Sequence, residues 1–178
     1  MDTEKIIGIA LSMGFSHAGK LDANTIVLRP EVREMCASGN CGRYGKSWSC
    51  PPGCGSLEEC AARIAKYSEG IIVQTTGELK DELDGEGMME AAKKHGETFR
   101  RFSETLRNDF PTALAIGNGS CNLCSECTYP DEPCRDPNGA IASMEALGMV
   151  VSDVCIANSL PYYYGKGTIT YVGCFLLK

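Results

Sequence analysis

Four cysteines lie within one short segment, CNLCSECTYPDEPC, with the spacing C-x2-C-x2-C-x6-C. Thiolates at successive intervals of three are typical of an iron-sulfur cluster, because three of them can hold three corners of a cubane while a fourth ligand comes from farther along the chain. Zinc is the alternative metal, but structural zinc usually takes two well-separated pairs of ligands. The spacing therefore predicts a 4Fe-4S cluster held by Cys121, Cys124, Cys127 and Cys134.

A second cysteine-rich segment, CASGNCGRYGKSWSCPPGCGSLEEC, lies upstream. Its Cys50 is followed by Pro51, and a proline also follows the cysteine that closes the bacterial ferredoxin run. The many glycines of this segment let the backbone wrap closely around a bulky inorganic core. We therefore predict a second 4Fe-4S cluster with Cys36, Cys41, Cys50 and Cys54 as its ligands. Without Cys54, this cluster would have an open iron.

The remaining cysteines and one histidine each have two interpretations. Free cysteine is among the most buried residue types, so Cys60, Cys155 and Cys174 are expected to pack in the core, and a role as cluster ligand or redox thiol is the alternative. His95 lies on the apolar stripe of a predicted helix. A hydrogen-bonded core histidine is the expectation there, and a proton relay or a donor to a cluster sulfur is the alternative.

Several aromatic and basic residues lie beside the predicted metal loops or near the carboxyl end of the chain. Trp48 and the run Tyr162–Tyr164 could shield a cluster from water or line a substrate pocket, or could simply pack. Lys46 and Arg135 could neutralise cluster charge or bind an anionic substrate, with a solvated surface as the alternative.

Composition limits the class of protein. The chain has 178 residues, 43% of them hydrophobic, and no linker or repeat divides it, so a single domain over residues 1–178 is expected. The amino terminus does not read as a secretory signal, and eleven cysteines then suit a reducing compartment, which predicts a cytoplasmic protein. The net charge is -6, or about -10 with two oxidised clusters, which argues against nucleic acid as a partner. No apolar run approaches a membrane span.

Periodicity and capping signals predict the elements that position the two loops. Ser56 and Glu59 form an S-x-x-E capping box that opens a helix to about residue 67, so the positive end of this helix would lie near the upstream loop. The other predicted elements are helices over residues 3–13, 81–109 and 141–147, strands over 71–76, 112–116 and 168–177, and a segment over 150–157 that fits either helix or strand.

The order of these elements predicts an α/β fold. A strand, a crossover helix and a strand over residues 71–116 suggest a right-handed parallel unit with the downstream loop at the carboxyl end of its second strand. The last strand is rich in β-branched and aromatic residues and should lie centrally. We predict one domain with a mixed sheet, flanking helices and two cysteine-rich metal-binding loops.

Four segments together resemble a known family: MCASGNCGRYGKSWSCPPGCGSLEEC, CNLCSECTYPDEPCRDP, SMEALGMVVSDVC and GTITYVGCFLL. Over almost its whole length, the chain is similar to the uncharacterised, cysteine-rich "predicted metal-binding protein" family, a domain-of-unknown-function family common in anaerobic bacteria and archaea. The resemblance implies metal binding at Cys36, Cys41 and Cys50 and at the four downstream cysteines. Many relatives have two residues between the first two cysteines, whereas four separate Cys36 from Cys41 here.

The predicted function is that of an iron-sulfur protein, and whether it is also an enzyme stays open. In the first interpretation, the protein is a ferredoxin-like module that transfers electrons to a redox partner protein. In the second, an open cluster iron acts as a Lewis acid on a small-molecule substrate. A third possibility is a zinc-stabilised protein or a metal carrier. Eight ligating cysteines favour electron transfer, and seven favour catalysis.

Overall fold

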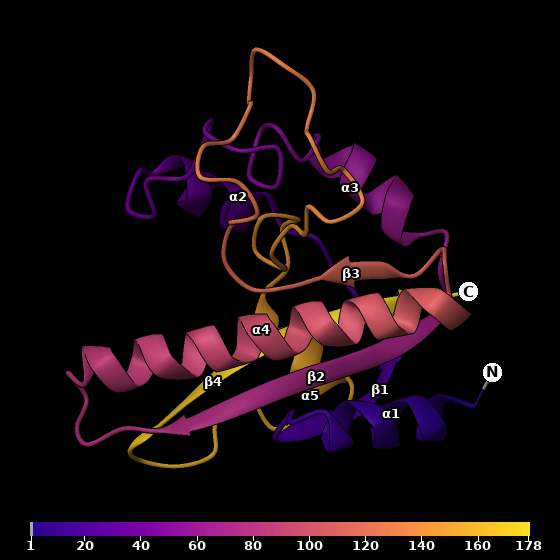
Figure 1. The fold of residues 1–178 in the computed structure, drawn as a ribbon, viewed down its shortest axis with the longest axis vertical. Helices are drawn as coiled ribbons and strands as arrows, with labels where there is room; N and C mark the ends of the chain where they lie inside the picture. Colours follow the sequence, from indigo (N-terminus) through magenta and orange to yellow (C-terminus); the bar gives the residue numbers. More distant parts are fainter. Residues whose placement is uncertain (1) are drawn as a thin grey trace.

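The computed structural model describes residues 2–178. Within them, four strands form one sheet in the order β1-β2-β4-β3, and every neighbouring pair is antiparallel (Figure 1). The strands are β1 (His17–Asp22), β2 (Glu69–Glu78), β3 (Leu114–Ile116) and β4 (Thr168–Leu177). With its helices on both faces of this sheet, the chain forms one α/β domain.

The prediction of a mixed sheet with an adjacent parallel pair is wrong. Because β2 and β3 each pair antiparallel with β4, they do run in the same direction, but β4 lies between them. All ten residues of β4 pair with β2, from Glu69 opposite Leu177 to Glu78 opposite Thr168, so β4 occupies the edge of β2 that β3 would need. The prediction that β4 lies centrally is confirmed.

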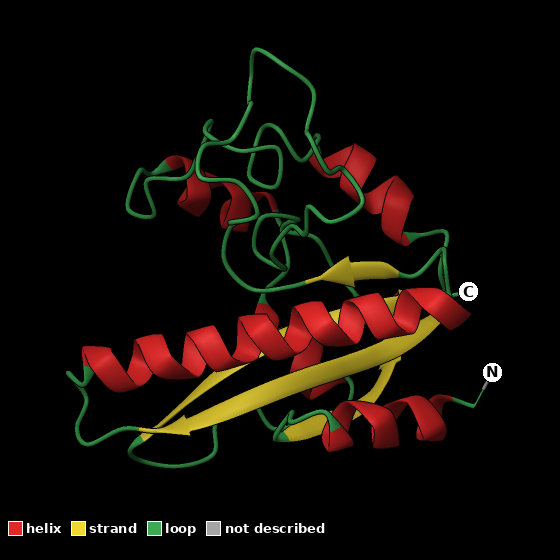
Figure 2. Cartoon of the chain, in the orientation of Figure 1, coloured by secondary structure: helices red, strands yellow, loops and turns green. Residues whose placement is uncertain are grey.

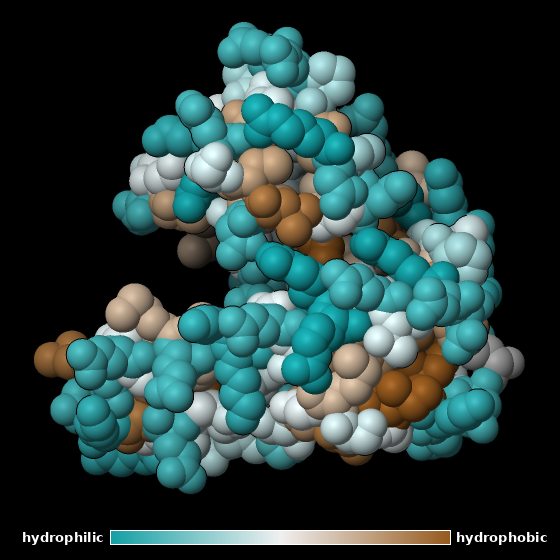
Figure 3. Space-filling model, viewed as in Figure 1, coloured by the Kyte–Doolittle hydropathy of each residue, from teal (hydrophilic) through white to brown (hydrophobic). Residues whose placement is uncertain are grey.

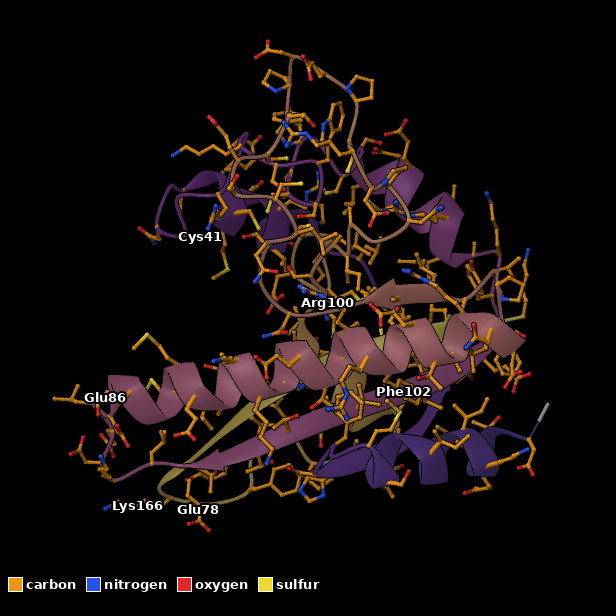
Figure 4. The ribbon with its side chains drawn as sticks, in the orientation of Figure 1. Cys41, Glu78, Glu86, Arg100, Phe102 and Lys166 are labelled. Carbon is orange, nitrogen blue, oxygen red and sulfur yellow. The ribbon has the colours of Figure 1, made fainter. Side chains whose placement is uncertain are left out.

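One face of the sheet is covered by α1 (Thr3–Ser12) and α4 (Gly85–Asp109). Side chains alternate between the two faces of a strand, so Ile71 and Val73 point toward these helices while Ile72 points away. Phe102 of α4 projects down from the helix on the side of the sheet and α1 (Figure 4). The buried cluster on this face consists of Ile6, Ala10, Phe15, Ile71, Val73, Phe99, Phe102, Leu106, Phe175 and Leu177.

The opposite face is covered by α3 (Leu57–Ile64), α5 (Val151–Ala157) and the turns between Met144 and Met149. The capping box of α3 is confirmed, since the Glu59 N–H donates to Ser56 Oγ at 3.1 Å and the Ser56 N–H donates to Glu59 Oε2 at 2.7 Å. This cap fixes the start of α3 directly after the upstream cysteine loop.

The predicted helix over residues 141–147 is wrong, because residues 144–148 form turns and Ser143 forms a bridge to Gly117. Their backbone groups bond to the segment after β3 instead: the Gly117 N–H donates to the Ala142 carbonyl at 2.9 Å and the Met144 N–H to the Gly117 carbonyl at 3.0 Å. The ambiguous segment that follows is helical, as α5. The periodicity did not predict β1 or the short helix α2 (Pro30–Ala37), which begins at a proline and has no fully buried residue.

His95 of α4 is completely buried, and its Nδ1 lies 2.9 Å from Thr75 Oγ1. The rings of Phe15, Phe99 and Tyr171 surround it at centroid distances of 5.7, 5.8 and 6.4 Å. Burial lowers the pKa of His95 to about 4. The pKa of Tyr171 is raised by burial, so this neighbour stays neutral throughout the acid range.

We expect the free energy of unfolding to decrease below about pH 6.5, because the unfolded chain then binds a proton on His95 that the folded chain does not bind. The decrease in the free energy of unfolding should approach about 3 kcal/mol as the pH falls toward 4. Urea unfolding at a series of pH values between about pH 7.5 and about pH 4.5 measures this decrease. The variant His95→Gln, which keeps a hydrogen-bonding group for Thr75, should show a shallower decrease, and an unchanged slope would contradict the assignment.

Candidate metal centre

The two cysteine-rich segments meet above the sheet and form a lobe that is mostly loop, flanked by α2 and α3 (Figure 2). We define this cysteine lobe as residues 36–60 and 117–140. Its two halves are joined by hydrogen bonds: the Cys121 N–H donates to Ser49 Oγ at 2.9 Å, and Trp48 Nε1 donates to the Glu132 carbonyl at 3.0 Å. The Trp48 ring also meets the Tyr129 ring edge-on at 4.9 Å.

The long helix α4 holds the downstream half of the lobe over the sheet. Arg100 Nη2 donates to Asn122 Oδ1 at 2.8 Å, and Arg107 donates to the Asn138 carbonyl. Arg100 lies at the upper surface of α4, directly below the lobe (Figure 4). Within the downstream loop, Arg135 Nη1 donates to the Glu126 carbonyl at 2.8 Å. These arginines anchor a segment that forms neither helix nor strand after β3.

The four downstream cysteines line one cavity. Cys121, Cys124, Cys127 and Cys134 surround it together with residues 47–49, and its volume is about 30 Å³. No three Cys, His, Asp or Glu side chains within residues 2–178 converge closely enough to hold a single metal ion. A four-iron core is larger than this cavity, so the largely exposed loop between residues 121 and 134 would have to move outward to admit it.

Cys127 lies in a cradle of hydrogen-bond donors. The backbone N–H of Tyr129 is the main cause of a lowered pKa for the Cys127 thiol, and the Trp48 N–H and the Ser47 hydroxyl add to it. Gly53 completes the cradle, because a Cβ at this position would lie 2.5 Å from the Ser47 carbonyl oxygen and 2.9 Å from the Tyr129 ring. Donors aimed at a thiolate favour metal ligation and tune the potential of a cluster. The donor set therefore fits an iron-sulfur cluster.

Three upstream cysteines, Cys36, Cys41 and Cys50, are near enough for their charges to affect one another. Burial raises the pKa of Cys50, which is only 7% exposed, and the neighbouring charges of Cys41 and Cys36 raise it further. Burial also raises the pKa of Cys36, at the last turn of α2, and Cys41 adds to that shift. Mutual charge effects of this kind place the three thiols in one region of the lobe, but their side chains do not converge on a single metal ion in this structure.

Cys41 is exposed at the lower side of the lobe, where it faces α4 across open space (Figure 4). The space-filling view shows a deep notch between the lobe and the layer that contains α4 (Figure 3). Between α4 and the downstream loop there is also a cavity of about 470 Å³, lined in part by Lys93, Arg100, Cys121 and Asn122. Glu97 lines the same cavity and pairs with Lys93 at 3.9 Å, so the lining carries charge of both signs.

Cys54 is placed differently from the other predicted ligands, because its thiol donates to a backbone carbonyl and lies beside Cys60. The Cys54 Sγ donates to the Ala146 carbonyl oxygen at 3.4 Å, and the Cys60 Sγ donates to the Cys54 carbonyl oxygen at 3.7 Å. Arg63 Nη2 and Arg33 Nη1 donate to the Cys60 Sγ at 3.5 and 3.8 Å. The hydrogen bond from Cys54, together with both guanidinium groups, lowers the pKa of Cys60 to about 6, while that of Cys54 is raised.

The arginine pair around Cys60 was not predicted from the sequence. Arg33 lies on α2 and Arg63 on α3, 30 positions apart, so no local motif connects them. The one available signal was the capping box, which places Cys60 at the first turn of a helix, one turn before Arg63.

The other residues considered from the sequence lie mainly in packing roles. Cys155 and Cys174 are completely buried, and Gln74 Nε2 donates to Cys155 Sγ at 3.5 Å. Tyr164 donates to Gln74 Oε1 at 2.6 Å and stacks on His17 at 4.1 Å, so it packs against the sheet. Lys46 is exposed on the lobe.

Comparison with known proteins gives one match. The model of the family described as "Predicted metal-binding protein (DUF2284)" matches residues 19–177. Neither the curated proteins nor the solved structures contain a match. Among the helices of residues 2–178, none combines the length and the apolar character that crossing a membrane requires.

Proposed function

Because the chain belongs to the DUF2284 family of predicted metal-binding proteins, we propose that it is a redox protein whose cysteine lobe holds two 4Fe-4S clusters. The observation that carries this proposal is the single cavity lined by all four downstream cysteines, in a loop with the C-x2-C-x2-C spacing. Cys121, Cys124, Cys127 and Cys134 would hold the downstream cluster. Such a cluster supplies one-electron chemistry when bound.

The upstream site is proposed to have three cysteine ligands. The charges of Cys36, Cys41 and Cys50 act on one another, while the Cys54 thiol donates to the Ala146 carbonyl oxygen at 3.4 Å. Three thiolates leave one iron of a cubane without a protein ligand from this set. This differs from the four-ligand set expected from the spacing alone, and it reduces the proposed ligand count from eight to seven.

Electron transfer to a redox partner is the function that we favour for the downstream cluster. The proposed Cys127 ligand already receives backbone and hydroxyl donors, which stabilise the added charge of a reduced cluster. Since the chain carries a net charge of -6, a partner with a basic surface would dock most readily.

A second candidate is an enzyme that uses the open upstream iron as a Lewis acid. Two observations favour it: the hydrogen bond of the Cys54 thiol to the Ala146 carbonyl oxygen, and the exposure of Cys41 at the side that faces the notch. Lys93, Glu97 and Arg100 line the neighbouring cavity, and Glu97 pairs with Lys93, so Arg100 is the cation there that would favour a small molecule with an anionic group.

Two matched variants test the ligand sets. On anaerobically purified protein we expect about eight irons and eight sulfides per chain, and Cys50→Ala should lose about half of each because it removes an upstream ligand. Cys54→Ala should retain the full content. Elemental analysis, sulfide determination and electron paramagnetic resonance before and after dithionite measure these outcomes.

The same measurements separate the alternatives. Loss of iron in Cys54→Ala would make Cys54 a ligand and restore the four-cysteine upstream set. A resonance signal that shifts on addition of a small anion would favour the enzyme. Zinc without sulfide in the wild-type protein would overturn the iron-sulfur proposal and favour a structural or carrier role.

A further inference from the structure

Ser47 and Ser49 lie in a tight turn of the upstream loop that ends at Cys50. The Cys50 N–H donates to the Ser47 carbonyl at 3.2 Å, and the Ser49 N–H donates to Ser47 Oγ at 3.2 Å. Both serines are buried, with exposed fractions of 5% and 3%. They also line the cavity that the four downstream cysteines surround. The turn therefore adjoins a proposed upstream ligand and forms part of the wall of the downstream site.

The Ser49 hydroxyl lies beside one proposed ligand residue of each site. Its oxygen accepts a hydrogen bond from the Cys121 N–H at 2.9 Å and lies 4.0 Å from Cys50 Sγ. The Ser47 hydroxyl oxygen lies 3.0 Å away on another side. A hydroxyl has a single proton, so Ser49 can donate to Ser47 or to Cys50 but not to both at once. We call this pair of buried hydroxyls the serine bridge.

The serine bridge has a direction, because the Cys121 N–H is its first donor and Cys50 is its last acceptor. Accepting a bond from the Cys121 N–H makes the Ser49 O–H a stronger donor toward the Cys50 sulfur. A donor to a ligating thiolate favours added negative charge and raises the potential of the cluster that the thiolate holds. The same bond holds the Cys121 N–H on the upstream side, so this donor is withheld from the downstream sulfurs.

We propose that Ser49 is a positioning residue that couples the two metal sites, by raising the reduction potential of the upstream cluster and lowering that of the downstream cluster. The inference rests on the proposed function, because it needs a cluster at each site. The contribution of Ser49 favours electron movement from the downstream to the upstream site. One electron leaves the first site and enters the second, so the transfer needs no further reactant.

Ser49→Ala tests the serine bridge, because it removes the hydroxyl that both sites share. On anaerobically purified protein with full iron and sulfide, the upstream potential should fall and the downstream potential should rise. For each cluster, we expect the ratio of reduced to oxidised form at a fixed potential to change about threefold, or about 28 mV at about 59 mV per tenfold. Redox titration followed by electron paramagnetic resonance measures both, and Cys50→Ala and Cys124→Ala, each expected to retain one cluster, assign the signals.

Two further serine variants separate the hydroxyl from the turn that carries it. Ser47→Ala removes the competing acceptor, so the Ser49 hydroxyl is left to Cys50 and the upstream potential should rise. This opposite sign keeps the test decisive if Ser49→Ala binds less iron. Ser103→Ala is the matched control, because Ser103 is a buried serine of α4 whose Oγ has no hydrogen-bond partner within the described residues. It should leave both potentials unchanged.

The remaining outcomes contradict the inference in distinguishable ways. Unchanged potentials in Ser49→Ala at full iron content would overturn the serine bridge and leave the clusters standing. Shifts of both potentials in the same direction would overturn it as well, because greater access of water moves both clusters alike. A fall of the upstream potential in Ser47→Ala would assign the effect to the turn. Zinc without sulfide in the wild-type protein would overturn the proposed function, and this inference with it.

Discussion

Replacing Cys124 by alanine should remove about half of the iron and sulfide of the protein, from about eight to about four of each. Cys124 is exposed and the other three cysteines around the downstream cavity are half-buried, so its loss leaves three thiolates and opens the outer side of the site to water. The reduced resonance signal of the downstream cluster should disappear as well. Elemental analysis and electron paramagnetic resonance measure both effects.

The same substitution should lower the thermal stability of the lobe. Residues 117–150 contain no helix or strand of their own, and a few side-chain bonds such as Arg100 to Asn122 hold this segment to α4. Where a loop depends on its metal, the free energy of metal binding is also free energy of folding. Limited proteolysis should therefore cut the downstream loop of Cys124→Ala faster than that of the wild-type protein.

Cys174→Ala is the matched control, because it removes a completely buried cysteine of β4 that lies in neither cysteine-rich loop. It should retain full iron and sulfide, with some loss of stability from the small cavity that it creates. Full iron and an unchanged spectrum in Cys124→Ala would remove this residue from the ligand set.

Phe175→Ala should have the largest effect on the stability of the sheet, a loss of about 3–5 kcal/mol. Phe175 is 1% exposed on the central strand β4, stacks on Phe99 at 4.3 Å and meets the Phe102 ring edge-on at 5.0 Å. Gly173 lies close to the same cluster, since a Cβ there would lie 2.4 Å from the Phe99 ring. Because these rings are tightly packed, the core has little room to close the cavity that Phe175→Ala would leave.

Urea unfolding measures this loss, and the midpoint of thermal unfolding should fall by about 10 °C. Leu83→Ala is the control, because Leu83 is 92% exposed and its truncation should change the free energy of unfolding by less than about 0.5 kcal/mol. At temperatures where it stays folded, Phe175→Ala should keep its iron, because the aromatic cluster lies on the face of the sheet covered by α1 and α4. Equal losses in the two variants would show that this cluster is not the core that holds the sheet together.

Elements set by local signals were predicted well. The helix that became α1, the capped start of α3, most of α4 and the central strand β4 follow from capping residues, a period near 3.6 or a run of β-branched and aromatic residues, all of which act within a few positions along the chain. The family was likewise predicted from its cysteine motifs, and its match to residues 19–177 confirms it.

Features that depend on distant partners were predicted poorly. The insertion of β4 between β2 and β3 requires the last strand of the chain to pair along all of β2. Nothing in the sequence of residues 69–116 indicates that a later strand will lie between them. Residues 141–147 carry helical periodicity, but their backbone groups bond to Gly117, so a tertiary contact overrode a local preference.

The cysteine lobe likewise combines features that the sequence predicts locally with features that depend on distant contacts. The sequence by itself determined two cysteine-rich loops, their spacings and an acidic chain of 178 residues with eleven thiols, because these are properties of residue order and composition. The tertiary structure decided the surroundings of these thiols: the four downstream cysteines line one cavity, and the Cys60 Sγ lies 3.7 Å from the Cys54 carbonyl oxygen. Arg33 of α2 and Arg63 of α3 both donate to the Cys60 sulfur, and such convergence arises only when the helices pack.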